Sequence, residues 1–585
     1  MGKNIIQKIF ESHSESKANV GDIIDVDIDV RVARDFGGAN VVKNLQENNL
    51  SINDPNKTFF TFDCNPGGCD QKYAANQQIC RIFARENNIR VFDINEGIGT
   101  HIVIDENIVK PGNTIISTDS HANILGAIGA FGQGMGDKDI AHAWAYGKVW
   151  FKVPPTIKLN IIGNPSRLAS PKDIVLKILK EIGANGLLGY AAEIYGDYIE
   201  NLSMDGRITI ASMATEMGGI IILFPSTDGY KADVDAEYDK IIDIDISNIG
   251  PMLSRPGHPE DVISIEHASN KLVDSGFIGS CTNGRMEDMR KVAKILKGRK
   301  IAPGRVLKIV PSTDKIWKKC LDEGIIKIFK EAGALVGSAG CAGCAAGQIG
   351  QTGNGEVALS SGNRNFLGKQ GKGDIYLASP STVAASLISG YITTEDAIPE
   401  NPKIFSSTKI KKSDIQKDDY VYNPPLKVEG KAWVIKKDNI DTDMIFHNRY
   451  LSITDVDKMG QYTFDNLEGY KDFAKDAMKG DIVVVGKNFG CGSSRQQAVD
   501  CFKALGISTI IGESFGSIYE RNAINNALPI LTIDDVTNKI DNMDFLSIDY
   551  LTGEVIDKTK NNKYFAKPFS KVQLEIYKNN GLLKK

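Results

Sequence analysis

Three cysteines carry the first chemistry that the sequence suggests. Cys341 and Cys344 form a Cys-x-x-Cys pair among glycines and alanines, which leave both sulfur atoms uncrowded. Cys281 follows a short apolar run and is therefore expected at the end of a buried strand. Three thiolates on two glycine-rich loops could hold an iron–sulfur cluster with one open iron, which would act as a Lewis acid. The pair alone would also fit a redox or a zinc site, although a second pair of zinc ligands is missing.

Two histidines could move protons. Asp119 lies two residues before His121, so its carboxylate could orient that imidazole, and His101 lies in another glycine-containing turn. Taken singly, such histidines are more often structural than catalytic. Both lie where strands are expected to end, which is where α/β folds usually place their sites.

A possible carboxylate-binding motif follows the cysteine pair. Residues 361–369 supply Asn363, Arg364 and Lys369, an amide and two cations that suit a carboxylate ligand. An Arg and Lys pair alone would normally be surface solvation. Its place just after the cysteines favours a role in substrate binding.

A second glycine-rich loop, residues 487–495, comes directly after an apolar run at 482–485. Its glycines let the backbone approach a ligand closely, and Arg495 could take a carboxylate in bidentate fashion. Ser493 and Ser494 add small hydroxyls, but a serine is a weak base unless backbone N–H groups and a cation stabilise its alkoxide. The loop could also simply cap the following helix, and both interpretations can hold together.

The elements around these motifs predict α/β layers, because strand-like runs, turns and helix-like stretches alternate along the chain. The strands are expected at 23–30, 58–63, 114–117, 208–217, 374–379, 482–485 and 508–511. The helices are expected at 73–87 and 381–389. A polar stretch with little periodicity is expected to separate a large cluster-binding region of several interlocked subdomains, 1–400, from a smaller domain, 429–585, through a linker at 401–428.

The composition bounds the class of protein. At 585 residues the chain should form several domains. Its 42% hydrophobic and 24% charged residues, with a net charge of −4, give no reason to expect binding to nucleic acid or membrane. No stretch reaches the length of a membrane span and the first residues lack the apolar core of a signal peptide, so a cytoplasmic location is expected. Nine cysteines are too sparse for a disulfide scaffold.

Taken in order, these motifs resemble the aconitase superfamily of iron–sulfur hydro-lyases, and within it the isopropylmalate isomerase and homoaconitase branch. The resemblance runs over nearly the whole chain, and its motifs are specific as an ordered set. They lie at 118–121, 150–154, 279–285, 341–344, 363–366, 441–443, 488–495 and 521–525. The implied fold is a large three-layer α/β/α region followed by a C-terminal swivelling β/α domain, which many members carry as separate subunits.

The resemblance implies roles for residues already named. The implied cofactor is a [4Fe-4S] cluster, with the ligands Cys281, Cys341 and Cys344. Ser493 would remove the α-proton of the substrate, with Ser494 and Arg495 beside it. His101, paired with a carboxylate, would help to protonate the departing hydroxyl. Elimination of water needs such a base and acid, together with a Lewis acid at the leaving oxygen.

Further implied positions surround the substrate. Asp119 and His121 would order the water at the iron. Arg364 and Asn363 would hold a substrate carboxylate and a cluster sulfur, and Glu216 would lie beside them.

Several positions depart from the family pattern. Asp63 is expected to be catalytic, but Cys64 follows it where the family usually has a histidine, so one imidazole is absent. Ser212 replaces a usual asparagine, and Lys369, expected to bind substrate, replaces a second arginine with a point charge. Cys64 could also be a fourth cluster ligand, whereas Cys69 is expected to be a structural thiol.

The expected substrate follows from residues 450–453, which resemble the substrate-selecting loop of the smaller domain. An arginine there is similar to homoaconitase and aconitase, and an aliphatic residue is similar to isopropylmalate isomerase, but Ser452 is neither. Without an arginine for a third carboxylate, a malate-type hydroxy dicarboxylic acid such as isopropylmalate or methylmalate is favoured. The alternative is aconitase or homoaconitase activity on a tricarboxylate.

A different class of function also stays open. Some relatives bind RNA when the cluster is lost, so the protein could be an iron-sensing, cluster-switched RNA-binding regulator. The net charge of −4 and the lack of a dense basic stripe disfavour this alternative. The expected partner is therefore a small-molecule hydroxy-carboxylic acid, with no nucleic acid and no membrane, for a monomer or small homo-oligomer.

Overall fold

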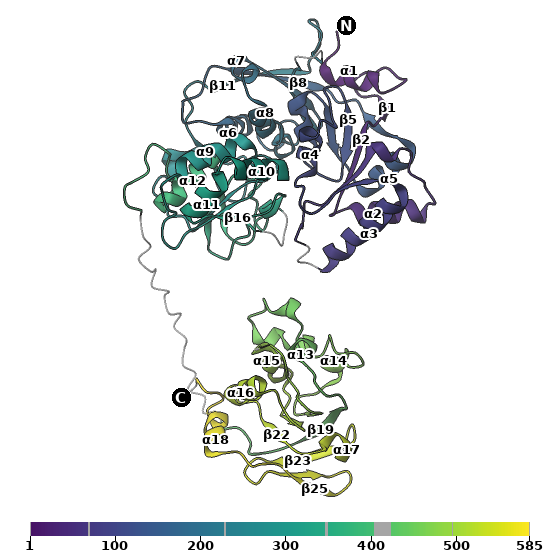
Figure 1. Ribbon diagram of the computed structural model, residues 1–585, viewed down its shortest axis with the longest axis vertical. Helices are drawn as coiled ribbons and strands as arrows, with labels where there is room; N and C mark the ends of the chain where they lie inside the picture. Colours follow the sequence, from purple (N-terminus) through teal and green to yellow (C-terminus); the bar gives the residue numbers. More distant parts are fainter. Residues whose placement is uncertain are drawn as a thin grey trace. The chain divides into compact units, whose positions relative to one another are not determined.

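The computed structural model describes residues 2–67, 71–226, 230–344, 349–402, 423–493 and 495–583. Its contacts divide the chain into two compact units, Met1–Ile410 and Lys411–Lys585 (Figure 1). Most of the expected linker lies outside the described residues, and its last positions already belong to strand β19 (Lys427–Ile435). The expected domain boundaries stay predictions.

A parallel sheet near the start of the first unit has the strand order β4-β3-β2-β5-β6. Its strands are β2 (Val30–Arg34), β3 (Thr58–Thr61), β4 (Arg90–Phe92), β5 (Thr114–Ser117) and β6 (Phe131–Gly134). The helices that follow its strands are α2 (Gly38–Glu47), α3 (Gln71–Asn87), α4 (Gly99–Asp105) and α5 (Asp137–Tyr146). Phe59 packs in one apolar cluster and its neighbour Phe60 in another, so the sheet is buried on both faces. Such sheets need apolar residues at successive positions, and the expected strand at 114–117 is confirmed.

A second sheet of this unit has the order β10-β9-β8-β11, with all strands parallel. Its strands are β8 (Thr156–Ile162), β9 (Ala191–Tyr195), β10 (Ile221–Leu223) and β11 (Lys240–Asp245). Its longer helices are α6 (Pro171–Ile182) and α8 (Met204–Ala211). The strand expected at 208–217 is wrong, because α8 and the 3-10 helix η3 (Ala214–Met217) occupy it. Ser203 caps α8, and the buried apolar run of a short helix cannot be told from a buried strand by its pattern.

A larger sheet completes the first unit, in the order β13-β12-β18-β17-β14-β15-β16. Its strands are β12 (Met252–Ser254), β13 (Val262–Ser264), β14 (Ser275–Ile278), β15 (Val306–Ile309), β16 (Leu335–Val336), β17 (Val357–Ser360) and β18 (Asp374–Leu377). The helices packed beside them are α9 (Met286–Leu296), α10 (Asp314–Asp322), α11 (Ile325–Ala332) and α12 (Pro380–Ser389) (Figure 1). The pairs of β12 are antiparallel, whereas β14, β15, β16, β17 and β18 run parallel. The first unit also carries α1 (Ile5–Ser12) and an antiparallel ribbon of β1 (Ile23–Asp27) with β7 (Lys148–Lys152).

The second unit is one mixed sheet in the order β22-β21-β20-β19-β23-β24-β25. Its strands after β19 are β20 (Ile482–Val485), β21 (Thr509–Gly512), β22 (Ile530–Thr532), β23 (Phe545–Asp549), β24 (Glu554–Asp557) and β25 (Asn562–Phe565). The longer helices are α15 (Gln497–Leu505), α16 (Ser517–Asn525) and α18 (Lys571–Lys578). Strand β19 pairs in parallel with β20 through its second half and antiparallel with β23 through its first half. The predicted α/β class is confirmed, and no helix among the described residues is long and apolar enough to cross a membrane.

Candidate active site

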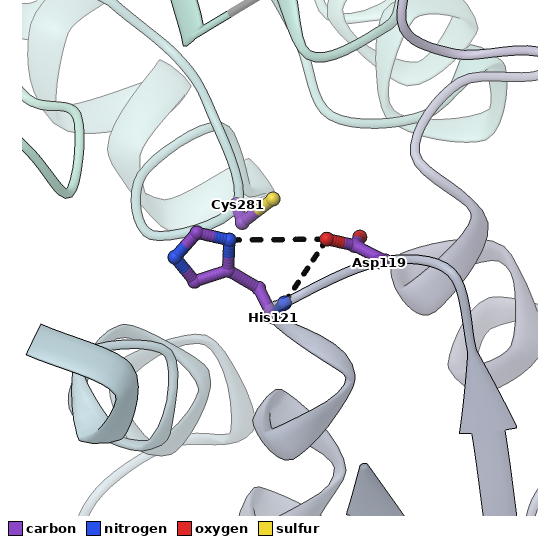
Figure 2. Close-up of side chains that lie close together, drawn as sticks. All are labelled: Asp119, His121 and Cys281. Atoms are coloured by element: carbon purple, nitrogen blue, oxygen red, sulfur yellow. Dashed lines mark hydrogen bonds and ion pairs between the residues drawn. The ribbon is translucent and has the colours of Figure 1, made fainter. Parts of the chain in front are cut away.

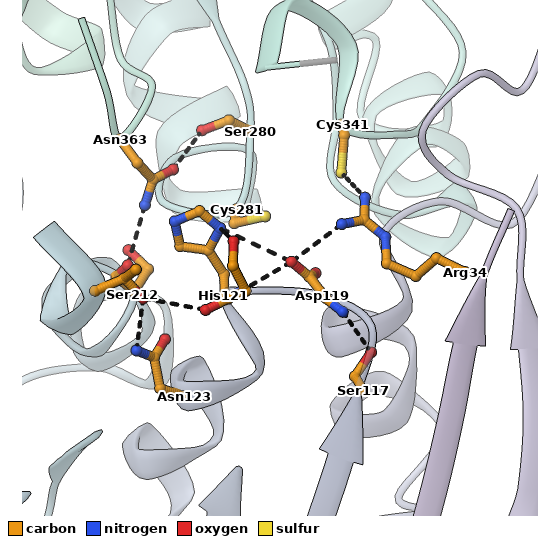
Figure 3. A network of polar contacts seen from close by, with 12 residues as sticks. Arg34, Ser117, Asp119, His121, Asn123, Ser212, Ser280, Cys281, Cys341 and Asn363 are labelled. Atoms are coloured by element: carbon orange, nitrogen blue, oxygen red, sulfur yellow. Dashed lines mark hydrogen bonds and ion pairs between the residues drawn. The ribbon is translucent and has the colours of Figure 1, made fainter. Parts of the chain in front are cut away.

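The carboxyl ends of two sheets of the first unit carry most of the candidate residues. Arg34 ends β2, Asp63 follows β3 and Asp119 follows β5, while Cys281 follows β14 and residues 361–365 follow β17. Strands β2, β3 and β5 are mutually parallel, as are β14 and β17, so the loops after each set emerge at one edge. Figure 3 shows side chains of the two sets facing each other.

The backbone just before Cys281 is held in an unusual conformation. Ser280 has a φ of 74°, a left-handed value that is costly for a residue with a side chain. A Cβ atom on Gly279 would lie 2.7 Å from the carbonyl oxygen of Val310, so this position requires glycine. The Oγ atom of Ser361 accepts the N–H of Gly279 at 3.0 Å and donates to its carbonyl at 3.2 Å. These bonds pin the Cys281 loop to the loop after β17.

Arg34 joins three of the buried groups and was missed by sequence reasoning. Its Nε atom donates to Asp63 Oδ1 at 2.7 Å, and its guanidinium lies 3.1 Å from Asp119 Oδ1 and 2.8 Å from Cys341 Sγ (Figure 3). Burial raises the pKa of Asp63 to about 6 despite this cation. Burial also opposes ionisation of Asp119, but Arg34 and His121 together outweigh burial and lower the pKa of Asp119. The signal that could have found Arg34 is a charged residue at the end of a buried strand.

The ring of His121 is hydrogen-bonded to a carboxylate other than the expected one. Its Nε2 atom lies 3.2 Å from Glu216 Oε1, whereas Asp119 Oδ1 accepts its backbone N–H at 3.0 Å and lies 3.8 Å from Nδ1. Asp119 therefore fixes the backbone, and Glu216 orients the imidazole. Ligand atoms of Asp119, His121 and Cys281 all lie within 4.8 Å of one another, which makes them a possible metal-binding group (Figure 2).

Glu216 and Asn363 link the loop after β17 to the segment after α8. The Nε atom of Arg364 donates to Glu216 Oε1 at 2.7 Å, and burial is outweighed by His121 and Arg364, which lower the pKa of Glu216. Asn363 accepts from Ser280 Oγ at 3.3 Å and donates to the carbonyl of Ser212 at 3.1 Å (Figure 3). Both ends of the Asn363 amide are thus bound to protein, so in this arrangement it orients its neighbours.

His101 is fully buried, and no carboxylate among the described residues is hydrogen-bonded to its ring. Its Nε2 atom lies 3.0 Å from the carbonyl oxygen of Cys281. The nearest acid on its own helix, Asp105, is instead paired with Arg285 at 2.8 Å and accepts a hydrogen bond from Thr313 at 2.8 Å. Burial, helped by Arg285, lowers the pKa of His101 to about 4. The described part of the chain thus does not supply the expected carboxylate, and with this pKa His101 is neutral near pH 7.

Cys64 lies in a second group of possible metal ligands, with Asp35 and Asp63. The carboxylate of Asp35 accepts the backbone N–H groups of Cys64 and Asn65 at 3.1 Å each. The thiol of Cys64 donates to Asp63 Oδ1 at 3.6 Å, and burial raises its pKa. These bonds give the group a structural role and disfavour Cys64 as a thiolate ligand of a cluster.

Some expected positions receive little or no description. Lys369 is half-buried near the end of the loop after β17. The backbone of Cys344 belongs to the 3-10 helix η5 (Ala342–Cys344), but its side chain lies outside the described part of the chain, as do Cys69 and Ser494. Their expected roles stay predictions.

In the second unit, the loop after β20 places Ser493 beside a charged pair. Ser493 is exposed, and its carbonyl accepts a hydrogen bond from Thr442 Oγ1 at 3.1 Å. Arg495 binds both carboxylate oxygens of Asp443, with Nη2 donating to Oδ2 at 2.7 Å, and this bond lowers the pKa of Asp443. The guanidinium expected to take a substrate carboxylate thus already holds one. Ser452 is exposed.

The donor set of the first unit fits an iron–sulfur centre. Cys281 and Cys341 are both buried and pack with Ile98 in one small cluster. The guanidinium of Arg34 at 2.8 Å from Cys341 Sγ would offset the negative charge that thiolate ligation brings. The buried atoms without a hydrogen-bond partner among the described residues include Asp119 Oδ2, Glu216 Oε2 and His101 Nδ1. Such atoms are free to contact a cluster, a water molecule or a substrate.

Comparison with known proteins agrees with this geometry. The profile of the aconitase family (aconitate hydratase) matches residues 7–230 and 225–390, and that of the aconitase C-terminal domain matches residues 412–535. Mitochondrial homoaconitase of Debaryomyces hansenii is 30% identical over 92% of this chain and 86% of its own length. Mitochondrial homoaconitase of Candida albicans is 29% identical over 92% of this chain and 87% of its own length.

A relative with a different name aligns with about two thirds of this chain. The 3-isopropylmalate dehydratase large subunit 2 of Archaeoglobus fulgidus is 36% identical over 67% of this chain and 98% of its own length. The resemblance noted in the sequence is therefore confirmed. With its two family profiles in one polypeptide, the chain belongs to the aconitase family of hydro-lyases, whose chemistry depends on an iron–sulfur cluster.

Proposed function

We propose that this protein dehydrates and rehydrates a malate-type hydroxy dicarboxylic acid, with isopropylmalate or methylmalate favoured, at a [4Fe-4S] cluster held by Cys281, Cys341 and Cys344. The observation that carries the proposal is the buried pair Cys281 and Cys341 beside the cation of Arg34. The names of the relatives support a hydroxy-carboxylic acid as the substrate. The exposed Ser452, in place of an arginine, supports a substrate with two carboxylates.

When bound, the cluster would supply a Lewis acid at the leaving oxygen. Arg364 and Glu216 would orient the substrate, because a guanidinium suits a carboxylate and Glu216 fixes that of Arg364 at 2.7 Å. His121, bonded to Glu216 at 3.2 Å, would hold the water that leaves and returns. The tautomer of His101 follows from its bond to a carbonyl, which can only accept. Nε2 therefore carries the proton, and Nδ1 would accept a hydrogen bond from the water that leaves and returns.

Ser493 is proposed as the base that removes the α-proton. Its exposure leaves the hydroxyl accessible, and Arg495 lies two residues away with its charge balanced by Asp443. A general base of this kind contributes about 10²–10⁴-fold to rate. The expected cytoplasmic location and a monomer or small homo-oligomer stay predictions, since two relatives are named as mitochondrial proteins.

A tricarboxylate is the second candidate substrate. The homoaconitases of two yeasts align over 92% of the chain, so the whole architecture is shared with enzymes named for such an acid. The loop at Ser452 would then have to bind a third carboxylate without an arginine of its own. Turnover of homocitrate or citrate above that of the dicarboxylates would favour this candidate.

The test is anaerobic reconstitution with iron and sulfide, followed by a substrate panel. The acids are isopropylmalate, methylmalate, dimethylmalate, homocitrate and citrate. Cys344→Ser should lose the cluster absorbance and all turnover, while Cys320→Ser, at a buried thiol packed against Met286, should keep both. Ser493→Ala should keep the cluster and lose turnover by about 10²–10⁴-fold. A protein that forms no cluster, or a Cys344→Ser variant with full activity, would refute the proposal.

A further inference from the structure

Lys172 is a fully buried lysine at the start of α6 that the proposed chemistry does not use. Its side chain is 0% exposed, and no ion pair of Lys172 occurs among the described residues. The Nζ atom donates to the carbonyl oxygen of Gly362 at 2.8 Å and lies 3.6 Å from the sulfur of Met213. Lysines are almost never fully buried unless paired, because moving an ammonium out of water is costly. An apolar side chain would fill this space at lower cost, so a specific role for the ammonium is implied.

The two contacts of Lys172 reach the two segments that carry the candidate substrate ligands. Gly362 directly precedes Asn363 and Arg364 in the loop after β17, and Met213 directly follows Ser212 in the segment that leads to Glu216. The same two segments are joined again by the bond of Asn363 to the Ser212 carbonyl at 3.1 Å and by that of Arg364 to Glu216 at 2.7 Å. Lys172 therefore provides a third contact between the loop after β17 and the segment that leads to Glu216.

The backbone around Lys172 is held in place by hydrogen bonds. Ser170 and Asp173 form a capping box at the start of α6, with the Ser170 N–H and Oγ each 2.7 Å from Asp173 Oδ2. The other oxygen of Asp173 accepts the backbone N–H of Met252 at 2.8 Å. Both oxygens of the neighbouring carboxylate are held by these bonds, and the ammonium donates to the Gly362 carbonyl instead.

We propose that Lys172 is a positioning residue that fixes the Gly362 turn against the Met213 segment, so that Arg364 and Glu216 keep the geometry that binds a substrate carboxylate. This inference rests on the proposed function. Lys172 also adds a positive charge near Arg364 and Glu216, where the substrate carboxylate would bind. Loss of the ammonium should therefore weaken substrate binding more than it slows the chemical step.

A pH dependence follows from the same placement. The charged groups that face Lys172 are Asp173 on α6 itself, Glu216 on η3 and Asp288 on α9. Burial lowers the pKa of Lys172 to about 7 against the opposing effect of these carboxylates. An anionic substrate favours the protonated form, so its affinity should fall as the pH rises above about 7.

The experiment compares KM and kcat of the reconstituted full-length enzyme at pH values of about 6.5 and 8.5. Lys172→Met, which keeps the length but loses the charge and donors, should raise KM about tenfold at the lower pH and change kcat less than about threefold. Its KM should no longer rise with pH. Lys172→Arg should keep KM within about threefold of wild type at both pH values, because arginine stays charged. The matched control is Lys177→Met on the same helix, where the lysine pairs with Glu181, and its KM should not change.

Two additional measurements test whether Lys172 acts through Arg364 and whether it affects binding independently of turnover. In an Arg364→Lys background, Lys172→Met should raise KM by a smaller factor, because the residue acts through Arg364. The dissociation constant of succinate, measured by calorimetry on the same proteins, should rise about tenfold in Lys172→Met even if no acid of the panel is turned over, which separates this inference from the proposed reaction.

Lys172→Met could instead lower kcat and raise KM by similar factors. If Lys172→Arg then restores neither value, Lys172 has a merely structural role and the inference is overturned. A KM within twofold of wild type in Lys172→Met would also overturn it. If Lys172→Met fails to fold, a wild-type KM that is the same at both pH values would overturn it as well.

Discussion

Replacement of Arg34 tests whether one cation holds the candidate site of the first unit together. The guanidinium serves two buried carboxylates, Asp63 and Asp119, and the buried sulfur of Cys341. Removing one partner of a buried ion pair costs about 3–5 kcal/mol, because an uncompensated charge stays behind. Arg34→Met is therefore expected to lower the free energy of unfolding of the first unit by about 3–5 kcal/mol at pH 8. Arg34→Lys keeps a charge but loses the fork, so the loss should be about 1.5–3 kcal/mol, as for one charge-assisted hydrogen bond.

The cost should depend on pH in a defined direction. The pKa of Asp63 is raised to about 6, so the folded protein retains a proton that the unfolded chain has lost, and stability falls as pH rises from about 4 to 6. Without Arg34 this pKa rises further and the fall extends to higher pH. The difference between Arg34→Met and wild type should therefore be smaller at pH 5.5 than at pH 8, because a protonated Asp63 no longer needs the cation.

The assay is urea unfolding of the cluster-free protein in a Trp433→Phe background. The remaining tryptophans, Trp144, Trp150 and Trp317, all belong to Met1–Ile410, so their emission reports on the first unit alone. The control is Arg81→Met, which breaks a partly exposed ion pair with Asp93 and should cost about 1 kcal/mol or less. A loss for Arg34→Met no larger than this control, or one equal at both pH values, would refute the reasoning.

Three further predictions concern specificity, the substrate ligands and a partly buried ion pair. Ser452→Arg should shift the ratio of kcat/KM toward homocitrate at least about tenfold by adding a charge-assisted pair, and an unchanged ratio would remove this loop from substrate selection. Glu216→Gln removes the charge that holds Arg364 and should lower kcat/KM by about tenfold or more while the cluster absorbance stays, which steady-state kinetics would show. The hydrogen bond that His13 donates to Asp29 raises the pKa of His13. The pair therefore stabilises the fold below the ordinary histidine pKa of about 6.5, and this stabilisation is lost as the pH rises through the raised pKa. His13→Gln should thus destabilise more at pH 6 than at pH 9, by under about 1 kcal/mol in chemical unfolding, and the reverse order would contradict the assignment.

The local pattern of apolar residues was sufficient to predict the strands that lead into the candidate site. The strand before Cys281 is β14, and the apolar run before the serine loop is β20, because strands buried on both faces read as continuous apolar runs. The same signal failed at 208–217, where a buried helix has an equally apolar sequence. Gly279 correctly predicted the turn before Cys281, because a local backbone conformation requires glycine there.

The sequence by itself determined the family, the α/β class and the residue types available for chemistry, because these follow from local pattern and ordered motifs. Tertiary structure alone decided which of those residues are partners. Arg34 lies 307 positions from Cys341, and Glu216 lies 95 positions from His121, distances at which no periodicity carries information. Likewise, Asp105 is paired with Arg285 and not with His101. Lys172 donates to the carbonyl of Gly362, which lies 190 positions further along the chain. Such pairings depend on how separate sheets bring their strand ends together. Burial lowers the local dielectric and so strengthens each hydrogen bond and ion pair.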